Sequence, residues 1–112
     1  MIQTPSFVIA FTTFPADGDA TSLAQRLIDE RLAACVNILP AMQSIYRWEG
    51  NVEQASEHQL IIKTTAARVD DLKKRIVALH PYDVPEVLVV PVSSGSEEYL
   101  LWIHDSVGTP SS

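Results

Sequence analysis

Apolar residues recur at two different spacings along this chain, and the changes in spacing divide it into strands and helices. Residues 7–14 form a short run of apolar, aromatic and β-branched types, which predicts a buried strand. Between Ala20 and Ala34, apolar positions recur at intervals of three and four, which predicts an amphipathic helix. A second strand is expected over Cys35–Leu39, and Pro40 is expected to interrupt it before the chain extends again.

The second half of the chain repeats this alternation. A helix is expected over about Ala67–Leu79 and should end before Pro81, because proline pushes the preceding residue out of the helical region. Val87–Val90 predicts another strand, and Ser96 is expected to cap a last helix. The order β-α-β-β-α-β plus a C-terminal helix predicts an α+β, ferredoxin-like fold. In that fold a four-stranded antiparallel sheet carries both helices on one face.

One segment in the middle of the chain predicts a long, protruding β-hairpin. Gly50-Asn51 suits a two-residue loop, which would place Trp48 opposite Glu53. The second arm, Val52–Thr65, contains no Pro or Gly and could extend about 45 Å at roughly 3.3 Å per residue. A domain of this size has a radius of gyration of only about 13 Å. We therefore expect the hairpin either to bend sharply or to project and meet a partner.

Composition narrows the possible partners. The 112 residues, 1–112, are expected to form a single domain, with 14 acidic and 8 basic residues and a net charge of −6. This charge argues against nucleic acid or an anionic membrane as a partner. One cysteine, Cys35, cannot form an internal disulfide, which favours a reducing compartment. No apolar run approaches the ~20 residues of a membrane span, and the N-terminus lacks a secretion signal, so we expect a cytoplasmic protein.

Few residues are candidates for chemistry. His80 precedes Pro81 near Asp83 and Glu86, and it is either a metal ligand or a hydrogen-bonding residue at a helix end. Cys35 is either a small buried residue or a soft metal ligand, if another ligand reaches it. The chain lacks the sequence motifs of nucleotide, flavin and hydrolase sites. We therefore expect no catalytic residue and no organic cofactor.

Aromatic and acidic residues gather on the predicted hairpin. Tyr46 and Trp48 share one face with Glu57 in the expected pairing. Large aromatic residues at a protruding tip are typical of interface anchors. We favour this interpretation over catalysis.

Five segments of the sequence closely resemble the divalent-cation tolerance (CutA) family. Together they lie within about residues 6–106, and they are Ala33–Pro40, Ser44–Gly50, Glu57–Thr64, His80–Val87 and Tyr99–Ile103. The resemblance implies a ferredoxin-like fold and a homotrimer in which the long hairpins pair with neighbouring subunits. It also implies a cytoplasmic role in tolerance to copper and other divalent metals, with no established enzymatic reaction.

The resemblance also bears on the metal ligands. In some family members the proposed copper ligands are a cysteine in the first strand and two adjacent histidines before the Pro-Tyr pair. Here Phe11 and Leu79 stand at two of these positions, and only His80 is retained. Cys35 matches the family's other cysteine.

Three functions remain open. The first is a metal-responsive trimer that binds copper or another divalent cation weakly, through His80 and interface carboxylates such as Glu57 or Glu86. The second is a regulatory trimer similar to the PII signalling proteins, with a small-molecule pocket between subunits. That pocket would be lined by Tyr46, Trp48, Lys63, His80 and Tyr82. The third, a small isomerase, is disfavoured because no acid–base pair is evident.

Overall fold

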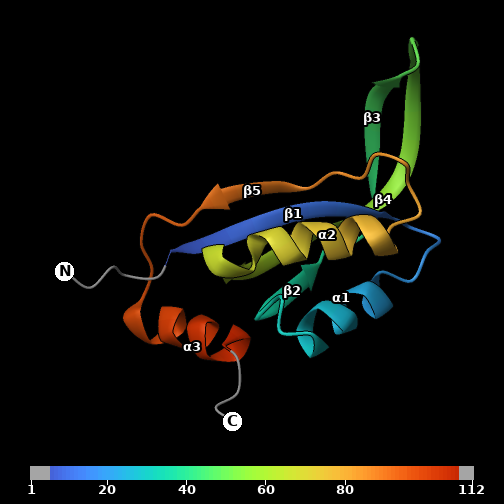
Figure 1. Cartoon of the computed structure of the whole chain (residues 1–112). Coiled ribbons are helices and arrows are strands. Elements are labelled where there is room, and N and C mark those ends of the chain that lie inside the picture. Colours follow the sequence, from blue (N-terminus) through green and yellow to red (C-terminus); the bar gives the residue numbers. More distant parts are fainter. Residues whose placement is uncertain (1–5, 109–112) are drawn as a thin grey trace.

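Five strands and three α-helices make up the part of the chain that the structure, a computed structural model, describes, which is residues 6–108. A short 3-10 helix, η1, precedes α2 (Figure 1). In chain order the elements are β1 (Phe7–Pro15), α1 (Ala20–Asp29), β2 (Cys35–Ile38), β3 (Met42–Trp48), β4 (Asn51–Thr65), η1 (Ala66–Arg68), α2 (Val69–Leu79), β5 (Leu88–Pro91) and α3 (Glu97–Val107).

The sheet is antiparallel, with the order β2-β4-β1-β5 and with β3 paired to the far part of β4. This is the strand order of the split βαβ motif, which confirms the predicted α+β, ferredoxin-like fold. As expected, Pro40 separates β2 from β3, the first arm of the hairpin, because proline cannot donate to a strand ladder. The sheet therefore has five strands where the sequence predicted four.

Both α1 and α2 cover the same face of this sheet. Side chains alternate between the two faces of the sheet along each strand. The paired residues Ala10 and Ile62 belong to the set that faces the helices. The resulting buried cluster confirms the expected layering. It contains Ala10, Phe14, Leu60 and Ile62 from the sheet and Leu23, Leu27, Leu72 and Ile76 from the helices. On the opposite face, the β5 residues Leu88 and Val90 are 60% and 41% exposed.

Helix α1 ends five residues before the predicted end, Ala34. Arg31 has a positive φ of 58°, and the Leu32 N–H donates to the Leu27 carbonyl at 2.9 Å while the Arg31 N–H donates to the Ile28 carbonyl at 3.0 Å. These two bonds form a Schellman motif, which satisfies the last helical carbonyls. The predicted boundary was wrong because Leu32 continues the apolar spacing of the helix. Its side chain is buried, but the residue lies beyond the end of the helix.

The hairpin projects from the rest of the molecule (Figure 1). The molecule measures 51 × 28 × 23 Å, and its radius of gyration of 15.3 Å exceeds the roughly 13 Å expected for a compact chain of this length. The turn residues are Glu49 and Gly50, with φ of 50° and 83°, as a type I′ turn requires. Trp48 therefore pairs with Asn51, so the predicted register was wrong by two residues. An even shift leaves every side chain on its predicted face.

Helix α3 is fixed at both ends. Ser96 caps its first turn by accepting a hydrogen bond from the Tyr99 N–H at 3.4 Å, as predicted. At its other end, Arg68 Nε donates to the Val107 carbonyl at 2.8 Å, where a cation also suits the helix dipole. None of the helices in residues 6–108 has the length and apolar character that crossing a membrane requires.

The turn geometry predicts opposite effects for two neighbouring substitutions. Gly50→Ala places a Cβ at a φ of 83°, and we expect it to destabilise the hairpin by about 1 kcal/mol. Glu49→Asn creates the pair that type I′ turns favour, and we expect a stabilisation of a few tenths of a kcal/mol. Hydrogen exchange of the hairpin amides measures both effects. Equal protection in the two variants would contradict the assigned turn.

Candidate functional site

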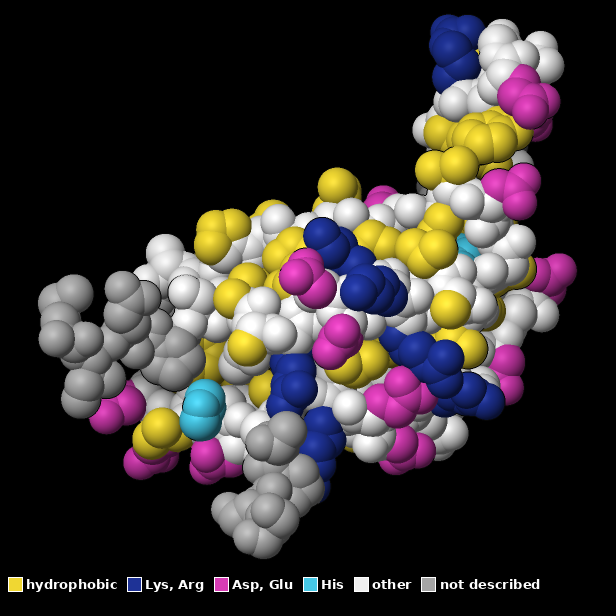
Figure 2. Space-filling view, viewed as in Figure 1, with side chains coloured by type: hydrophobic (Ala, Val, Ile, Leu, Met, Phe, Trp, Pro, Cys, Tyr) yellow, Lys and Arg dark blue, Asp and Glu magenta, His cyan; other side chains and the backbone are white. Residues whose placement is uncertain are grey.

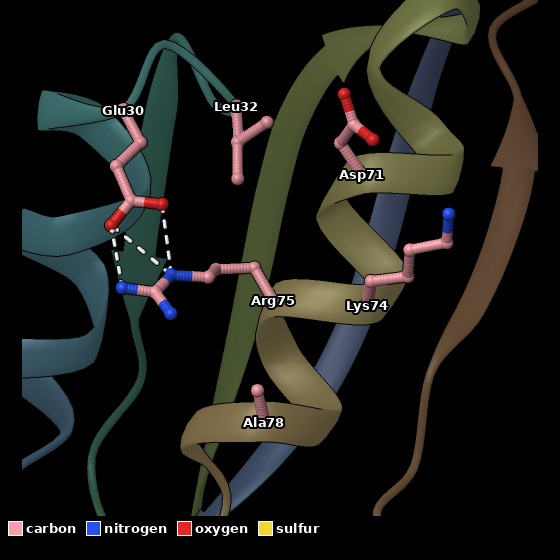
Figure 3. Close-up of a pocket in the computed structure, with 6 residues that line it drawn as sticks. All are labelled: Glu30, Leu32, Asp71, Lys74, Arg75 and Ala78. Atoms are coloured by element: carbon pink, nitrogen blue, oxygen red, sulfur yellow. Dashed lines mark hydrogen bonds and ion pairs between the residues drawn. The ribbon is translucent and has the colours of Figure 1, made fainter.

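A shallow charged depression lies between α1 and α2 (Figure 3). Arg75 from α2 donates to both carboxylate oxygens of Glu30, with Nε–Oε1 and Nη2–Oε2 distances of 2.8 and 2.9 Å. Two parallel bonds of this kind fix the end of α1 against α2. Because its central charges satisfy each other, we assign this depression a structural role.

The second hollow is a groove at the base of the hairpin, with a volume of about 740 Å³. We name it the hairpin-base groove. Hydrophobic side chains gather on the hairpin above the body of the molecule (Figure 2). The lining residues come from β1, β3, β4 and the connection between α2 and β5, and they are Thr13, Met42, Ser44, Ile45, Tyr46, Trp48, Glu57, Gln59, Pro81, Tyr82, Asp83, Val84 and Glu86.

Strand alternation explains why polar and aromatic side chains meet here. On β4, Glu57 and Gln59 point away from the face that carries the buried Leu60. On β3, Tyr46 and Trp48 are also two positions apart and share the face of Glu57, because paired residues of antiparallel strands lie on one side. The expected grouping of these aromatics with Glu57 is therefore present.

His80 joins the loop after α2 to the end of β1. Its backbone leaves the helix with φ −86° and ψ 141°, as expected before Pro81. Its Nδ1 accepts a hydrogen bond from the Tyr82 N–H at 3.1 Å, so Nε2 carries the proton and donates to the Thr13 carbonyl. The ring is 8% exposed and lies edge-on to Phe14, with centroids 5.1 Å apart. Both ring nitrogens are engaged, so coordination of a metal requires one of these bonds to break.

Tyr82 and Glu57 form the closest side-chain contact in the groove. The Tyr82 hydroxyl donates to Glu57 Oε2 at 2.7 Å. Burial and this bond to a carboxylate raise the pKa of the Tyr82 phenol well above its usual range, because both disfavour the phenolate. Glu57 is only 5% exposed, and no lysine, arginine or histidine within residues 6–108 forms an ion pair with it.

Gln59 is a groove residue that the sequence analysis missed. Its Nε2 donates to the Thr12 carbonyl at 2.8 Å and to Glu86 Oε2 at 3.1 Å. It therefore positions the Glu86 carboxylate at one end of the groove. The signal was present in the sequence, since Gln59 is two positions from Glu57 on the same strand and so shares its face.

Other predicted site residues lie elsewhere. Lys63 is four positions beyond Gln59 on β4, roughly 13 Å along the strand, and its Nζ lies 5.9 Å from the centroid of the Tyr99 ring. Cys35 pairs with Lys63, so it does not approach His80. Neither Lys63 nor His80 is among the residues that line the groove of a single chain. The pocket expected between subunits stays a prediction.

Phe11 and Leu79, which stand where some family members have proposed copper ligands, also lie away from the groove. Phe11 pairs with Ile61 and Leu88, and Leu79 packs against the buried cluster. Within the described part of the chain, no three His, Cys, Asp or Glu side chains converge well enough to hold a metal ion.

A split βαβ sheet with a projecting hairpin and an acidic, aromatic groove at its base defines a ferredoxin-like α+β protein with a candidate binding site. Residues 8–106 match the family described as CutA1 divalent ion tolerance protein, and the chain belongs to this family. The resemblance inferred from the sequence is thereby confirmed.

Individual relatives agree with this assignment. The divalent-cation tolerance protein CutA of Thermus thermophilus is 45% identical over 100 residues, which are 89% of this chain and 97% of that protein. A chloroplastic CutA protein of Arabidopsis thaliana is 41% identical over 93% of this chain and 57% of its own length. The crystal structure of CutA1 from Oryza sativa superposes with a TM-score of 0.88 at 42% identity, covering 92% of this chain and 94% of that chain.

The raised pKa of Tyr82 predicts how stability changes at high pH. A group whose pKa is higher in the folded state contributes stability that is complete below its unfolded value, about 10 for tyrosine, and is lost as the pH rises further. We expect the free energy of unfolding to fall above pH 10 more steeply in the wild type than in Tyr82→Phe. Chemical denaturation between pH 8 and pH 11 measures this difference, and parallel curves would contradict it.

Proposed function

We propose that this chain is a non-catalytic, cytoplasmic homotrimer that acts in divalent-cation tolerance and binds divalent cations, copper among them, weakly near its subunit interfaces. The observation that carries the proposal is the hairpin-base groove of a CutA-family chain, whose lining includes Glu57, Asp83 and Glu86 and contains no lysine, arginine or histidine. An acidic groove of this kind attracts cations from solution.

The donor set supports weak binding. Carboxylate oxygens suit hard divalent cations, and copper prefers nitrogen and sulfur donors. Glu57 and Glu86 supply oxygens, whereas Cys35 is remote and both nitrogens of His80 are hydrogen bonded. Ligands from a second subunit would complete the site. Proton-transfer chemistry has little support, because His80 and Glu57 are both engaged within the protein.

Exposed apolar surface supports the homotrimer. On the hairpin, Ile45 and Val52 are each 66% exposed, and on β5, Leu88 is 60% exposed. An exposed hairpin with apolar side chains favours pairing with other chains. Copies of the same chain would cover these surfaces, as the family resemblance implies. The free thiol of Cys35 supports a reducing compartment such as the cytoplasm.

The metal site predicts a difference between two variants. We expect calorimetric titration with Cu(II) or Zn(II) to show weak, saturable binding that Glu86→Gln lowers by at least about tenfold, since it removes a charged oxygen ligand. Glu97→Gln, on the first turn of α3, is the matched control and should bind as the wild type does. If only His80→Ala abolishes binding, the carboxylate site is wrong and the histidine is the ligand.

The homotrimer predicts that Trp48 is an interface anchor. Truncation of a buried interface tryptophan typically costs about 2 kcal/mol or more, so Trp48→Ala should shift the assembly toward smaller species at micromolar concentration. Val77→Ala, 55% exposed on α2, is the control, because it removes exposed apolar surface from the other side of the sheet. Analytical ultracentrifugation distinguishes the species. A wild-type chain that sediments as a monomer would falsify the proposal.

A second candidate function is a PII-like regulatory trimer that binds a small organic ligand. The size of the groove and its aromatic walls favour this candidate. Small-molecule sites usually enclose about 300–1,000 Å³, and the groove, at about 740 Å³, lies within that range.

A further inference from the structure

We propose that the assembly closes the hairpin-base groove of each copy with Lys63 of a neighbouring copy, whose ammonium group forms an ion pair with Glu86. This inference rests on the homotrimer of the proposed function, and it names the residue through which one copy completes the groove of the next.

Lys63 carries a charge that has no opposite partner within the described part of its own chain. On β4 it pairs with Ile9 of β1 and Cys35 of β2, so its side chain lies on the open face of the sheet, opposite the face that the helices cover. It is half-buried, and its Nζ lies 5.9 Å from the centroid of the Tyr99 ring. No carboxylate within residues 6–108 forms an ion pair with it. An aromatic face attracts a cation but does not neutralise its charge.

The other basic residues are engaged or lie elsewhere. The chain has eight lysines and arginines. Five of them donate to carbonyls or pair with carboxylates within their own chain, and they are Arg31, Arg47, Arg68, Lys73 and Arg75. Arg26 and Lys74 belong to α1 and α2, on the helical side of the sheet. Among the described residues, Lys63 is therefore the basic residue that lies on the open sheet face without a charged partner.

Glu86 is the complementary group in the groove. Its Oε2 accepts a hydrogen bond from Gln59 Nε2 at 3.1 Å, and this neutral donor orients the carboxylate without balancing its charge. Glu57 is 5% exposed and binds the Tyr82 hydroxyl, whereas Asp83 is exposed to water. Within the described chain, the groove lining includes no lysine, arginine or histidine. Glu86 is therefore the half-buried groove carboxylate that a cation from another copy can reach.

Lys63 and Glu86 do not meet within one chain. Gln59, which orients Glu86, is four positions from Lys63 on β4, roughly 13 Å along the strand, and the Lys63 ammonium group lies at the Tyr99 ring on α3. The pair therefore has to join different copies. A contact between two different patches is heterologous, and it closes into a ring when the copies are related by a rotation axis, as in a homotrimer. The two patches lie at different ends of one open face, as a contact of this kind requires.

The apolar character of the open face explains why the ion pair forms. Lys63 lies in one row across the sheet with Ile9 and Val90, and Val90 and Leu88 are 41% and 60% exposed. A neighbouring copy that covers these side chains also removes Lys63 from water. A buried ammonium group without an opposite charge is costly, so the covering surface must supply a carboxylate. The same ammonium group competes with a divalent cation for Glu86, in agreement with the weak metal binding proposed above.

The experiment follows the exchange of subunits between unlabelled and isotope-labelled assemblies by native mass spectrometry. Lys63→Glu brings two carboxylates together and Glu86→Lys brings two ammonium groups together. We therefore expect each to accelerate exchange at least about tenfold or to dissociate the assembly. The double variant Lys63→Glu/Glu86→Lys reverses the pair and should return exchange to within about threefold of the wild-type rate. Lys63→Met, which keeps an unbranched side chain but removes the charge, should give a rate between these two.

Two controls and a mixing experiment complete the test. Lys74→Glu on α2 and Asp29→Lys on α1 change the net charge equally at exposed positions on the helical side, and both should exchange at the wild-type rate. Circular dichroism checks that each variant folds. When Lys63→Glu copies are mixed with Glu86→Lys copies, interfaces between unlike copies have opposite charges. Mixed assemblies should therefore exceed the proportion that random mixing gives.

The outcomes separate this inference from the homotrimer on which it rests. Unchanged exchange in the single variants, no recovery in the double variant, or random mixing of the single variants overturns the ion pair and leaves the homotrimer intact. A wild-type chain that is monomeric in native mass spectrometry contradicts the homotrimer and the ion pair together. Accelerated exchange in the single variants, recovery in the double variant and preferential mixing support the inference.

Discussion

The hydrogen-bonding capacity of β4 is the constraint on which the rest of the structure depends. This strand spans Asn51–Thr65 and pairs with β1, β2 and β3. The remaining described strand, β5, pairs with β1 instead. The lack of Pro and Gly in β4 allows an uninterrupted ladder. Because β1 pairs with β4 only as far as Glu57, the first part of β4 pairs with β3 alone, and the two extend beyond the sheet as the hairpin. The projection is a direct consequence of the length of β4.

The alternation of β4 also divides the molecule into a structural side and a candidate functional side. Leu60 and Ile62 face the helices and are fully buried. Glu57 and Gln59 face the opposite side, at the point where the hairpin leaves the sheet. The same backbone periodicity therefore builds the core and presents polar groups to the groove. A change of register by one residue would exchange the two sets and destroy both.

The groove is closed on its other side by a loop that the buried His80 holds in place. Its two ring nitrogens connect the end of β1 to the start of that loop, which brings Tyr82 within hydrogen-bonding distance of Glu57. His80 thus acts as a framework residue in this chain. Membership of the CutA family and the acidic lining both favour cations as the ligands.

The sequence by itself determined the order of the elements, the layering and the family, because apolar spacing and proline positions act over short ranges. It also placed Tyr46, Trp48 and Glu57 on one face. Tertiary structure decided the features that depend on contacts between residues far apart in the chain, which short-range patterns do not contain. The Schellman motif ended α1 early, since the burial of Leu32 comes from packing outside the helix. The distance of Cys35 and Lys63 from the groove, and the bonds that engage both nitrogens of His80, follow from strand pairing between segments far apart in the chain.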